Sequence, residues 1–129
     1  MNIYAVCVLV LGKDFTGGNV AVGVARKTDP KSFGLIGGKV EESDESPVAA
    51  AIRECKEESG LILTNPVEVY RRVYDKGIVI TYMGDVEGSP ASLLNESDCR
   101  WCSFDELLAG RFGEYNKDLF LKLRLGITT

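Results

Sequence analysis

Apolar residues in the first half of the chain follow the continuous and alternating patterns that are typical of β-strands. Residues 4–11 and 19–25 are two such runs, and the polar, glycine-rich segment 12–18 between them predicts a hairpin loop. The short apolar run 33–36 predicts a strand that leads into Gly37 and Gly38. Three more strands are expected at residues 67–74, 78–83 and 100–103, with the turn signal Asp75-Lys76-Gly77 between the first two.

The pattern changes to the helical period in the middle of the chain. Ser46 is a favourable N-cap, Pro47 suits the first helical position and Gly60 ends a helix, so residues 46–59 are expected to be helical. One arc of this helix is apolar and is expected to dock on the sheet. Its members are Val48, Ala51, Ile52 and Cys55.

Two further helices are expected near the C-terminus, at residues 104–109 and 116–125, with Gly126 closing the second. Strands around one central helix, followed by more helices, predict an α/β protein in which a mixed sheet is sandwiched between helices, an α/β/α layer arrangement. The 129 residues suffice for one domain with a real core, so residues 1–129 are interpreted as a single domain.

A second arc of the central helix is acidic and carries Glu54, Glu57 and Glu58. Carboxylates at this spacing repel each other, at a cost of about 0.2–0.5 kcal/mol per pair. They also lie in the last turns, where the helix dipole disfavours negative charge by about 0.3–1 kcal/mol each. A cation bound to the cluster would remove both penalties, whereas the alternative is an ordinary charged helix surface.

Charge and composition exclude several classes of partner. The formal net charge of −4 argues against non-specific binding to a nucleic-acid backbone, so no nucleic-acid partner is expected. The apolar run 5–11 is far too short to span a membrane, and the first residues carry no basic segment of a signal peptide. A cytoplasmic protein without a membrane partner is therefore expected.

The chain contains no histidine, which excludes catalytic triads, histidine bases and histidine metal ligands. Acid–base or metal chemistry must come from carboxylates, lysine, tyrosine or cysteine. Cys99 and Cys102 form a lone CxxC in a predicted strand, where residues three apart point to opposite faces. Packing is the favoured interpretation for this pair, and a redox or metal role is the alternative.

The stretch from Gly37 to Leu61 resembles the Nudix box, in which glycine, five residues, glutamate and seven residues precede Arg-Glu-apolar-any-Glu-Glu-any-Gly-apolar. Residues 53–61, Arg-Glu-Cys-Lys-Glu-Glu-Ser-Gly-Leu, match the end of the box at every position. The loop before them is one residue longer than in the family. Asp44 has the family's spacing from Gly38, whereas Glu45 has it from Arg53, and Glu45 is preferred as the box glutamate.

The resemblance implies a Nudix-like fold and a metal-dependent hydrolase related to MutT that uses Mg²⁺ or Mn²⁺. It implies that Glu54, Glu57 and Glu58 bind the metal together with the carbonyl of Gly38. Arg53 is expected to orient the box carboxylates without touching substrate. The general base is either a box glutamate or an acid on a later loop, such as Glu96 or Asp98. The catalytic residues expected from the resemblance are Glu57, Glu54, Arg53, Glu45 and Asp98.

Residues around the box suggest how a nucleotide would be held. Arg26, Lys27 and Lys39 flank the box in sequence and are expected to meet phosphates. Phe33 is expected to stack on a base, with a core position as the alternative. The same two interpretations are open for Tyr74, Tyr82 and Trp101.

The family typically hydrolyses a nucleoside diphosphate linked to another moiety. Markers for ADP-ribose and dinucleoside polyphosphates are missing from residues 75–79, so the prediction is a nucleoside or deoxynucleoside triphosphate cleaved to monophosphate and pyrophosphate. The alternatives are an ADP-ribose or nucleotide-sugar pyrophosphatase, or a non-catalytic nucleotide-binding regulator on the same fold. A small-molecule nucleotide is the expected partner, and a homodimer is possible.

Overall fold

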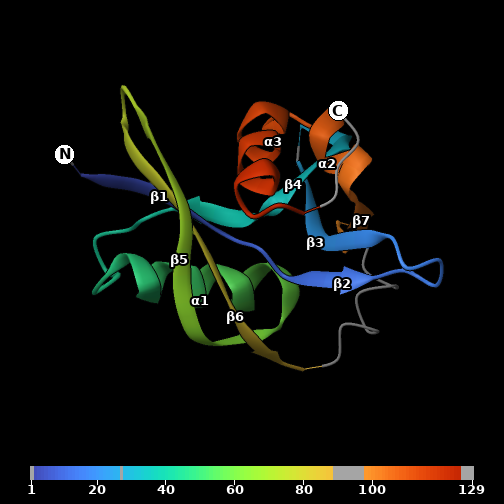
Figure 1. The fold of residues 1–129 in the computed structure, drawn as a ribbon. Coiled ribbons are helices and arrows are strands. Elements are labelled where there is room, and N and C mark those ends of the chain that lie inside the picture. The colour runs from blue at the N-terminus through green and yellow to red at the C-terminus, as the bar shows by residue number, and fades with distance from the viewer. Residues whose placement is uncertain (1, 27, 89–97, 126–129) are drawn as a thin grey trace. The chain divides into compact units, whose positions relative to one another are not determined.

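The computed structural model describes residues 2–26, 28–88 and 98–125. They form a mixed α/β fold, which confirms the predicted class (Figure 1). The elements in chain order are β1 (Ile3–Val8), β2 (Leu11–Lys13), β3 (Asn19–Arg26), β4 (Asp29–Lys39), α1 (Pro47–Ser59), β5 (Ile62–Tyr74), β6 (Gly77–Glu87), β7 (Cys99–Ser103), α2 (Phe104–Ala109) and α3 (Gly113–Lys122).

The chain divides into two compact units. The first unit consists of residues 1–10 and 36–90, and the second consists of residues 11–35 and 91–129. Strand β4 contributes its last residues, from Ile36 onward, to the first unit and its earlier residues to the second.

The first unit contains a mixed set of strands with α1 packed on it. β1 pairs in parallel with β6 and antiparallel with the end of β4, while β5 and β6 form a long antiparallel hairpin (Figure 1). α1 contacts β1, β5 and β6. Fully buried side chains of the strands form the core of this unit: Val6, Val8, Ile36 and Ile80.

Helix α1 begins and ends as predicted. The Ser46 hydroxyl accepts a hydrogen bond from the Ala49 amide at 3.0 Å. Gly60 has a φ of 76° and donates its amide to the Lys56 carbonyl at 2.9 Å. The buried face differs from the predicted arc, because Ala50 is fully buried beside Ala51 and Cys55, whereas Ile52 is 36% exposed. The helix is thus rotated toward Ala50, which places Ile52 at the margin of the contact.

The second unit is built around β3, which pairs antiparallel with β2, with β7 and with the first part of β4. α2 packs on β3 and β7, and α3 packs on α2. The Ser103 hydroxyl and the Glu106 carboxylate form a capping box at the start of α2. Phe104 and Phe120 stack between α2 and α3 with ring centres 4.1 Å apart.

Several element boundaries differ from the expectations. The predicted strand 4–11 ends at Val8, and Leu11 opens β2. The last helix begins at Gly113 and not at Asn116. The Asn116 side chain is buried and donates to the Leu107 carbonyl of α2 at 3.2 Å. Gly126 lies outside the described residues. None of the helices in the described part of the chain has the length and apolar character needed to cross a membrane.

Candidate functional site

The acidic arc of α1 faces the glycine pair at the end of β4. One carboxylate oxygen of Glu58 accepts a hydrogen bond from the Gly37 amide at 2.8 Å. Burial raises the pKa of Glu58 to about 7, and the neighbouring charges of Glu54 and Glu57 act in the same direction. The Gly37 hydrogen bond opposes this rise in the pKa without cancelling it. Glu58 is therefore a carboxylate whose charge is costly until a cation lies beside it.

The Glu54 carboxylate lies where a side chain at position 38 would begin, so Gly38 leaves room for it. A Cβ at residue 38 would lie 2.6 Å from one carboxylate oxygen of Glu54 and 3.0 Å from the other. Any larger residue would displace the Glu54 side chain, which is only 12% exposed. Burial is also the largest cause of the raised pKa of Glu54, and the nearby carboxylates Glu57 and Glu41 add to it. The missing side chain of Gly38 thus makes the space that holds the Glu54 carboxylate.

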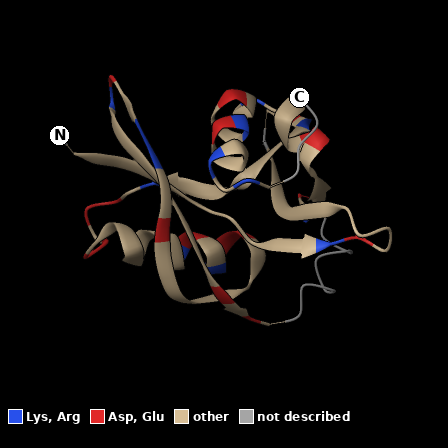
Figure 2. Ribbon diagram, viewed as in Figure 1, with Lys and Arg blue, Asp and Glu red and all other residues tan. Residues whose placement is uncertain are grey.

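Arg53 connects the carboxylates of this region. Its Nη1 donates to Glu54 Oε1 at 2.8 Å and to Glu57 Oε2 at 3.3 Å. Its Nη2 donates to the Lys39 carbonyl at 3.2 Å, which ties the guanidinium to the end of β4. These bonds place Arg53 beside two of the box carboxylates that it is expected to orient. Figure 2 shows the setting, with acidic residues in the loop before α1 and along the helix.

The other side of the guanidinium binds Asp44. Arg53 Nε and Nη2 donate to the two Asp44 oxygens at 2.9 Å each, a bidentate pair in which the Asp44 side chain is 5% exposed. The pair lowers the pKa of Asp44 to about 2 and raises the pKa of Arg53 above its usual range. Asp44 is therefore the acid that sets the position of Arg53.

Of Asp44 and Glu45, Asp44 is the acid that contacts Arg53, whereas the spacing from Arg53 favoured Glu45 as the box glutamate. Glu45 is exposed, directly before the helix cap. Asp44 is fixed by a turn in which its amide donates to the Glu41 carbonyl at 3.0 Å, and its carboxylate accepts from the Glu41 amide at 2.8 Å. Asp44 also has the family's spacing from Gly38. Which of the two acids acts as the box glutamate stays a prediction.

The donor chemistry of this cluster fits a divalent cation. Carboxylate and carbonyl oxygens are the ligands that Mg²⁺ prefers, and a cation would favour the charged forms that burial disfavours in Glu54 and Glu58. Among the described residues no three carboxylates or thiols are gathered closely enough to hold a metal ion as they stand. Their oxygens instead accept from Arg53 and from the Gly37 amide. The residues expected to bind the metal therefore lie near one another. Their role as ligands stays a prediction for Gly38, Glu54, Glu57 and Glu58.

Other residues predicted for the site belong to the second unit. Asp98 is exposed there, and its carbonyl accepts from the Ala25 amide at 2.7 Å. Arg26 ends β3, where its backbone is paired with that of Asp29 in β4. Lys27 and Glu96 lie outside the described residues.

The aromatic candidates divide between core and surface. Phe33 is 7% exposed, and the Arg100 guanidinium lies over its ring at 4.2 Å from the ring centre, so this face is already covered. Tyr82 is also buried, whereas Tyr74 is 41% exposed. Phe33 and Tyr82 are therefore core residues, which is one of the two interpretations that the sequence left open. Cys99 and Cys102 are buried, and neither forms a disulfide.

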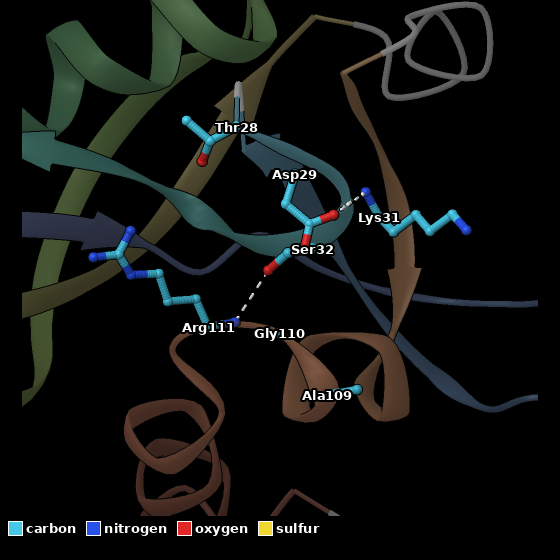
Figure 3. A pocket seen from close by; sticks show the side chains of 7 residues that line it. All are labelled: Thr28, Asp29, Lys31, Ser32, Ala109, Gly110 and Arg111. Carbon is cyan, nitrogen blue, oxygen red and sulfur yellow. Dashed lines mark hydrogen bonds between the residues drawn. The ribbon is translucent and has the colours of Figure 1, made fainter.

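A cavity of about 440 Å³ lies in the second unit, between the start of β4 and the segment after α2 (Figure 3). The Ser32 hydroxyl accepts from the Arg111 amide at 3.1 Å across it. The side chains of Lys31 and Arg111 extend away from each other, so the two positive charges do not converge on a ligand position. Its lining is Thr28, Asp29, Lys31, Ser32, Ala109, Gly110 and Arg111, none of them predicted for the site.

The fold and the box together define the class of protein. The NUDIX domain family model matches residues 1–123, so the chain belongs to the Nudix family. The likeness that the box residues suggested is thereby confirmed over nearly the whole chain. No curated protein sequence matches this one.

Solved structures show the same fold at low sequence identity. NrtR from Shewanella oneidensis is 16% identical with a TM-score of 0.72, and the match covers 95% of this chain and 62% of that one. The NUDIX domain of the same protein, complexed with ADP ribose, is 16% identical with a TM-score of 0.66, covering 96% and 87%. A MutT structure from a study of the Aliivibrio salmonicida and Vibrio cholerae proteins is 20% identical with a TM-score of 0.66, covering 93% and 98%. NrtR has also been crystallised with a 27mer DNA. The present chain thus spans less than two thirds of the full NrtR chain.

Proposed function

We propose that this protein is a metal-dependent pyrophosphohydrolase that cleaves a nucleoside diphosphate linked to another group. The observation that carries the proposal is the complete carboxylate set on α1. Glu54 lies against Gly38, Glu58 accepts from the Gly37 amide, and Glu57 is held by Arg53. A protein that only binds nucleotides does not need three neighbouring carboxylates that repel each other, two of which, Glu54 and Glu58, are also disfavoured by burial.

The residues of the chain have distinct tasks in this proposal. When bound, Mg²⁺ or Mn²⁺ polarises a phosphoryl oxygen and lowers the pKa of a water ligand. Glu54, Glu57 and Glu58 supply oxygen ligands for the ion, together with the Gly38 carbonyl. Arg53 keeps Glu54 and Glu57 in place through its bonds to both, and Asp44 in turn keeps Arg53 in place. The side chain of Glu57 is 58% exposed, so it is the box carboxylate most accessible to a substrate or a proton.

The proposed substrate is a nucleoside or deoxynucleoside triphosphate, with monophosphate and pyrophosphate as products. The fold shared with MutT supports this choice. ADP-ribose or a nucleotide sugar is the second candidate, supported by the ADP ribose bound to the NrtR NUDIX domain. Cytoplasmic location and a homodimer stay predictions from the sequence.

A non-catalytic regulator is the alternative from a different class. NrtR is a neighbour in fold and binds DNA in one structure, but its chain is longer than the part matched here. The carboxylate set favours the enzyme over the regulator, since binding alone would not need it.

A nucleotide panel with Mg²⁺ tests the proposal. It includes dNTPs, 8-oxo-dGTP, ADP-ribose, nucleotide sugars and dinucleoside polyphosphates, and it compares wild type with Glu57→Gln and a control, Glu114→Gln, on the exposed surface of α3. We expect at least one substrate to be hydrolysed by wild type and by the control, and Glu57→Gln to be slower by about 100-fold or more. The catalytic proposal fails if no substrate turns over, or if Glu57→Gln equals wild type.

A further inference from the structure

One face of the sheet in the first unit carries a row of residues with a cation at each end. Side chains of residues that lie directly opposite each other on paired strands share a face of the sheet. Lys39 of β4 is opposite Ala5 of β1, and Ala5 is opposite Val79 of β6. Val79 is in turn opposite Arg72 of β5. Lys39 and Arg72 therefore share one face, and their backbones are separated by three strand spacings, or about 14 Å.

This face is turned away from α1. Gly38 precedes Lys39 on β4, and the Glu54 carboxylate of α1 lies where a Cβ of Gly38 would begin. Because successive residues of a strand point to opposite faces, the Lys39 side chain is on the face opposite the helix. The row is therefore separate from the carboxylates of the candidate metal site, and a function of this face does not depend on the proposed hydrolysis.

Aromatic side chains alternate with a cation along β5. Tyr70, Arg72 and Tyr74 occupy every second position of this strand and are paired with every second position of β6. All three side chains thus lie on the face that carries Lys39. The Arg72 guanidinium lies 5.4 Å from the ring centre of Tyr74, which is 41% exposed. The strand therefore combines aromatic surface and positive charge on one face.

Another aromatic ring lies beside two cations near the Lys39 end of the row. The Nζ atoms of Lys39 and Lys76 lie 5.7 Å and 5.8 Å from the ring centre of Tyr4. Both lysines are exposed, and Lys76 comes from the turn between β5 and β6. Within the part of the chain that the structure describes, neither lysine has a carboxylate at ion-pair distance. Lysine and arginine segments of the β5–β6 hairpin are visible in Figure 2.

The chemistry of these side chains selects a class of ligand. Phosphate oxygens would balance the positive charge, and unpaired bases stack on aromatic side chains in proteins that bind single strands. A duplex keeps its bases stacked on each other, and an acidic protein segment offers charge without a base to stack. The combination of cations and rings on one sheet face therefore favours a single strand over both.

We propose that this face binds single-stranded nucleic acid. The residues that form it, called the basic–aromatic face below, are Tyr4, Lys39, Tyr70, Arg72, Tyr74 and Lys76. The net charge of −4 led to the expectation that no nucleic acid is bound, and the proposal revises this expectation for one local surface of opposite charge. Three cations limit the contact to about three phosphates, so the binding is weak and sensitive to salt.

Fluorescence anisotropy of labelled strands tests the proposal without any nucleotide hydrolysis. The probes are an oligouridine, an oligodeoxythymidine and a DNA duplex of the same length, and the two single strands distinguish RNA from DNA. With three phosphate contacts, affinity for a single strand should fall roughly 20-fold between 50 and 200 mM salt. The duplex should bind at least about tenfold more weakly. No binding of either single strand at 50 mM salt, or equal binding of the duplex, overturns the proposal.

Variants show whether the strand lies on the basic–aromatic face. Lys39→Ala and Lys76→Ala should each make the slope of log affinity against log salt less steep by about 0.7. Tyr74→Leu should lower the affinity about tenfold without changing this slope, whereas Tyr74→Phe should keep it. Lys117→Ala, at an exposed lysine of α3, is the control and should bind as wild type does.

Three results of these measurements would contradict the proposal. One is wild-type affinity in the Lys39, Lys76 and Tyr74 variants, which would place the strand elsewhere. Another is a loss of affinity that occurs only together with a loss of thermal stability. The third is displacement of the strand by poly-L-glutamate as effective as by an unlabelled strand, which would identify an acidic protein segment as the partner.

Discussion

Arg53 and Asp44 are joined by two hydrogen bonds of 2.9 Å, from Nε to Oδ1 and from Nη2 to Oδ2. A bidentate pair of this kind fixes both the position and the plane of a guanidinium. The remaining nitrogen of Arg53 is then directed at Glu54 and Glu57. Asp44 has no hydrogen bond to either glutamate, so it acts on their arrangement through Arg53.

Replacement of Asp44 should therefore impair activity, although Asp44 is not a metal ligand in this account. We expect Asp44→Ala to lower kcat/KM by about 10- to 100-fold, the usual effect of losing a group that orients metal ligands. Glu45→Ala should stay within about twofold of wild type, because Glu45 is exposed. Kinetics on the best substrate of the nucleotide panel measures both. A larger loss for Glu45→Ala than for Asp44→Ala would identify Glu45 as the box glutamate.

The same pair predicts a pH dependence of stability. Arg53 lowers the pKa of Asp44 from 3.8 to about 2. Since the pKa is lower in the folded state, the stabilisation is fully present above the unfolded pKa and is lost as the pH falls through about 2. The difference in the free energy of unfolding between wild type and Asp44→Asn should therefore be constant from pH 7 to 5 and shrink between pH 4 and 2. Urea unfolding at pH 6, 4 and 3 measures it, and a difference as large at pH 3 as at pH 6 would contradict the pairing.

Two glycines should respond to alanine in opposite ways. Gly38→Ala places a methyl group against the Glu54 carboxylate, so we expect kcat/KM to fall by about 100-fold, as when catalytic groups are displaced by about 1 Å. Gly60→Ala meets no neighbouring atom but strains a residue with a φ of 76°. It should lower the free energy of unfolding by about 1–2 kcal/mol and leave kcat/KM within about twofold. Full activity of folded Gly38→Ala would show that Glu54 does not need its present position.

Asn116 should matter for stability alone. Its buried side chain donates to the Leu107 carbonyl, which would lose this bond in Asn116→Ala. We expect the free energy of unfolding to fall by about 1–3 kcal/mol, whereas the neighbouring exposed residue in Lys117→Ala should change it by less than about 0.5 kcal/mol. Denaturant titration compares the two variants. Equal stability of Asn116→Ala and wild type would mean that the Leu107 carbonyl finds another partner.

The sequence predicted the features that depend on local chemistry. Three residues in or beside α1 predicted where this helix begins and ends: Ser46, Pro47 and Gly60. The acidic arc of α1 follows from helical spacing. The helix expected at residues 104–109 likewise coincides with α2. These features need no knowledge of distant segments, which explains their agreement with the structure.

Features that depend on tertiary contacts were not predictable in the same way. Spacing alone left Asp44 and Glu45 as rivals, and only the folded loop shows which carboxylate reaches Arg53. The helix expected at residues 116–125 begins at Gly113, and the Asn116 side chain donates to the Leu107 carbonyl within the core. The contact of Lys76 with Tyr4 joins segments about 70 residues apart and has no sequence signal.

Binding of Mn²⁺ tests most directly whether the α1 carboxylates form a metal site. Electron paramagnetic resonance counts free Mn²⁺ during titration of wild type, Glu57→Gln, Glu58→Gln and the control Glu114→Gln, without any substrate. We predict that wild type and the control bind Mn²⁺ alike and that both box variants bind it at least about tenfold more weakly. Affinities that are the same in all four proteins would contradict a metal site at these glutamates.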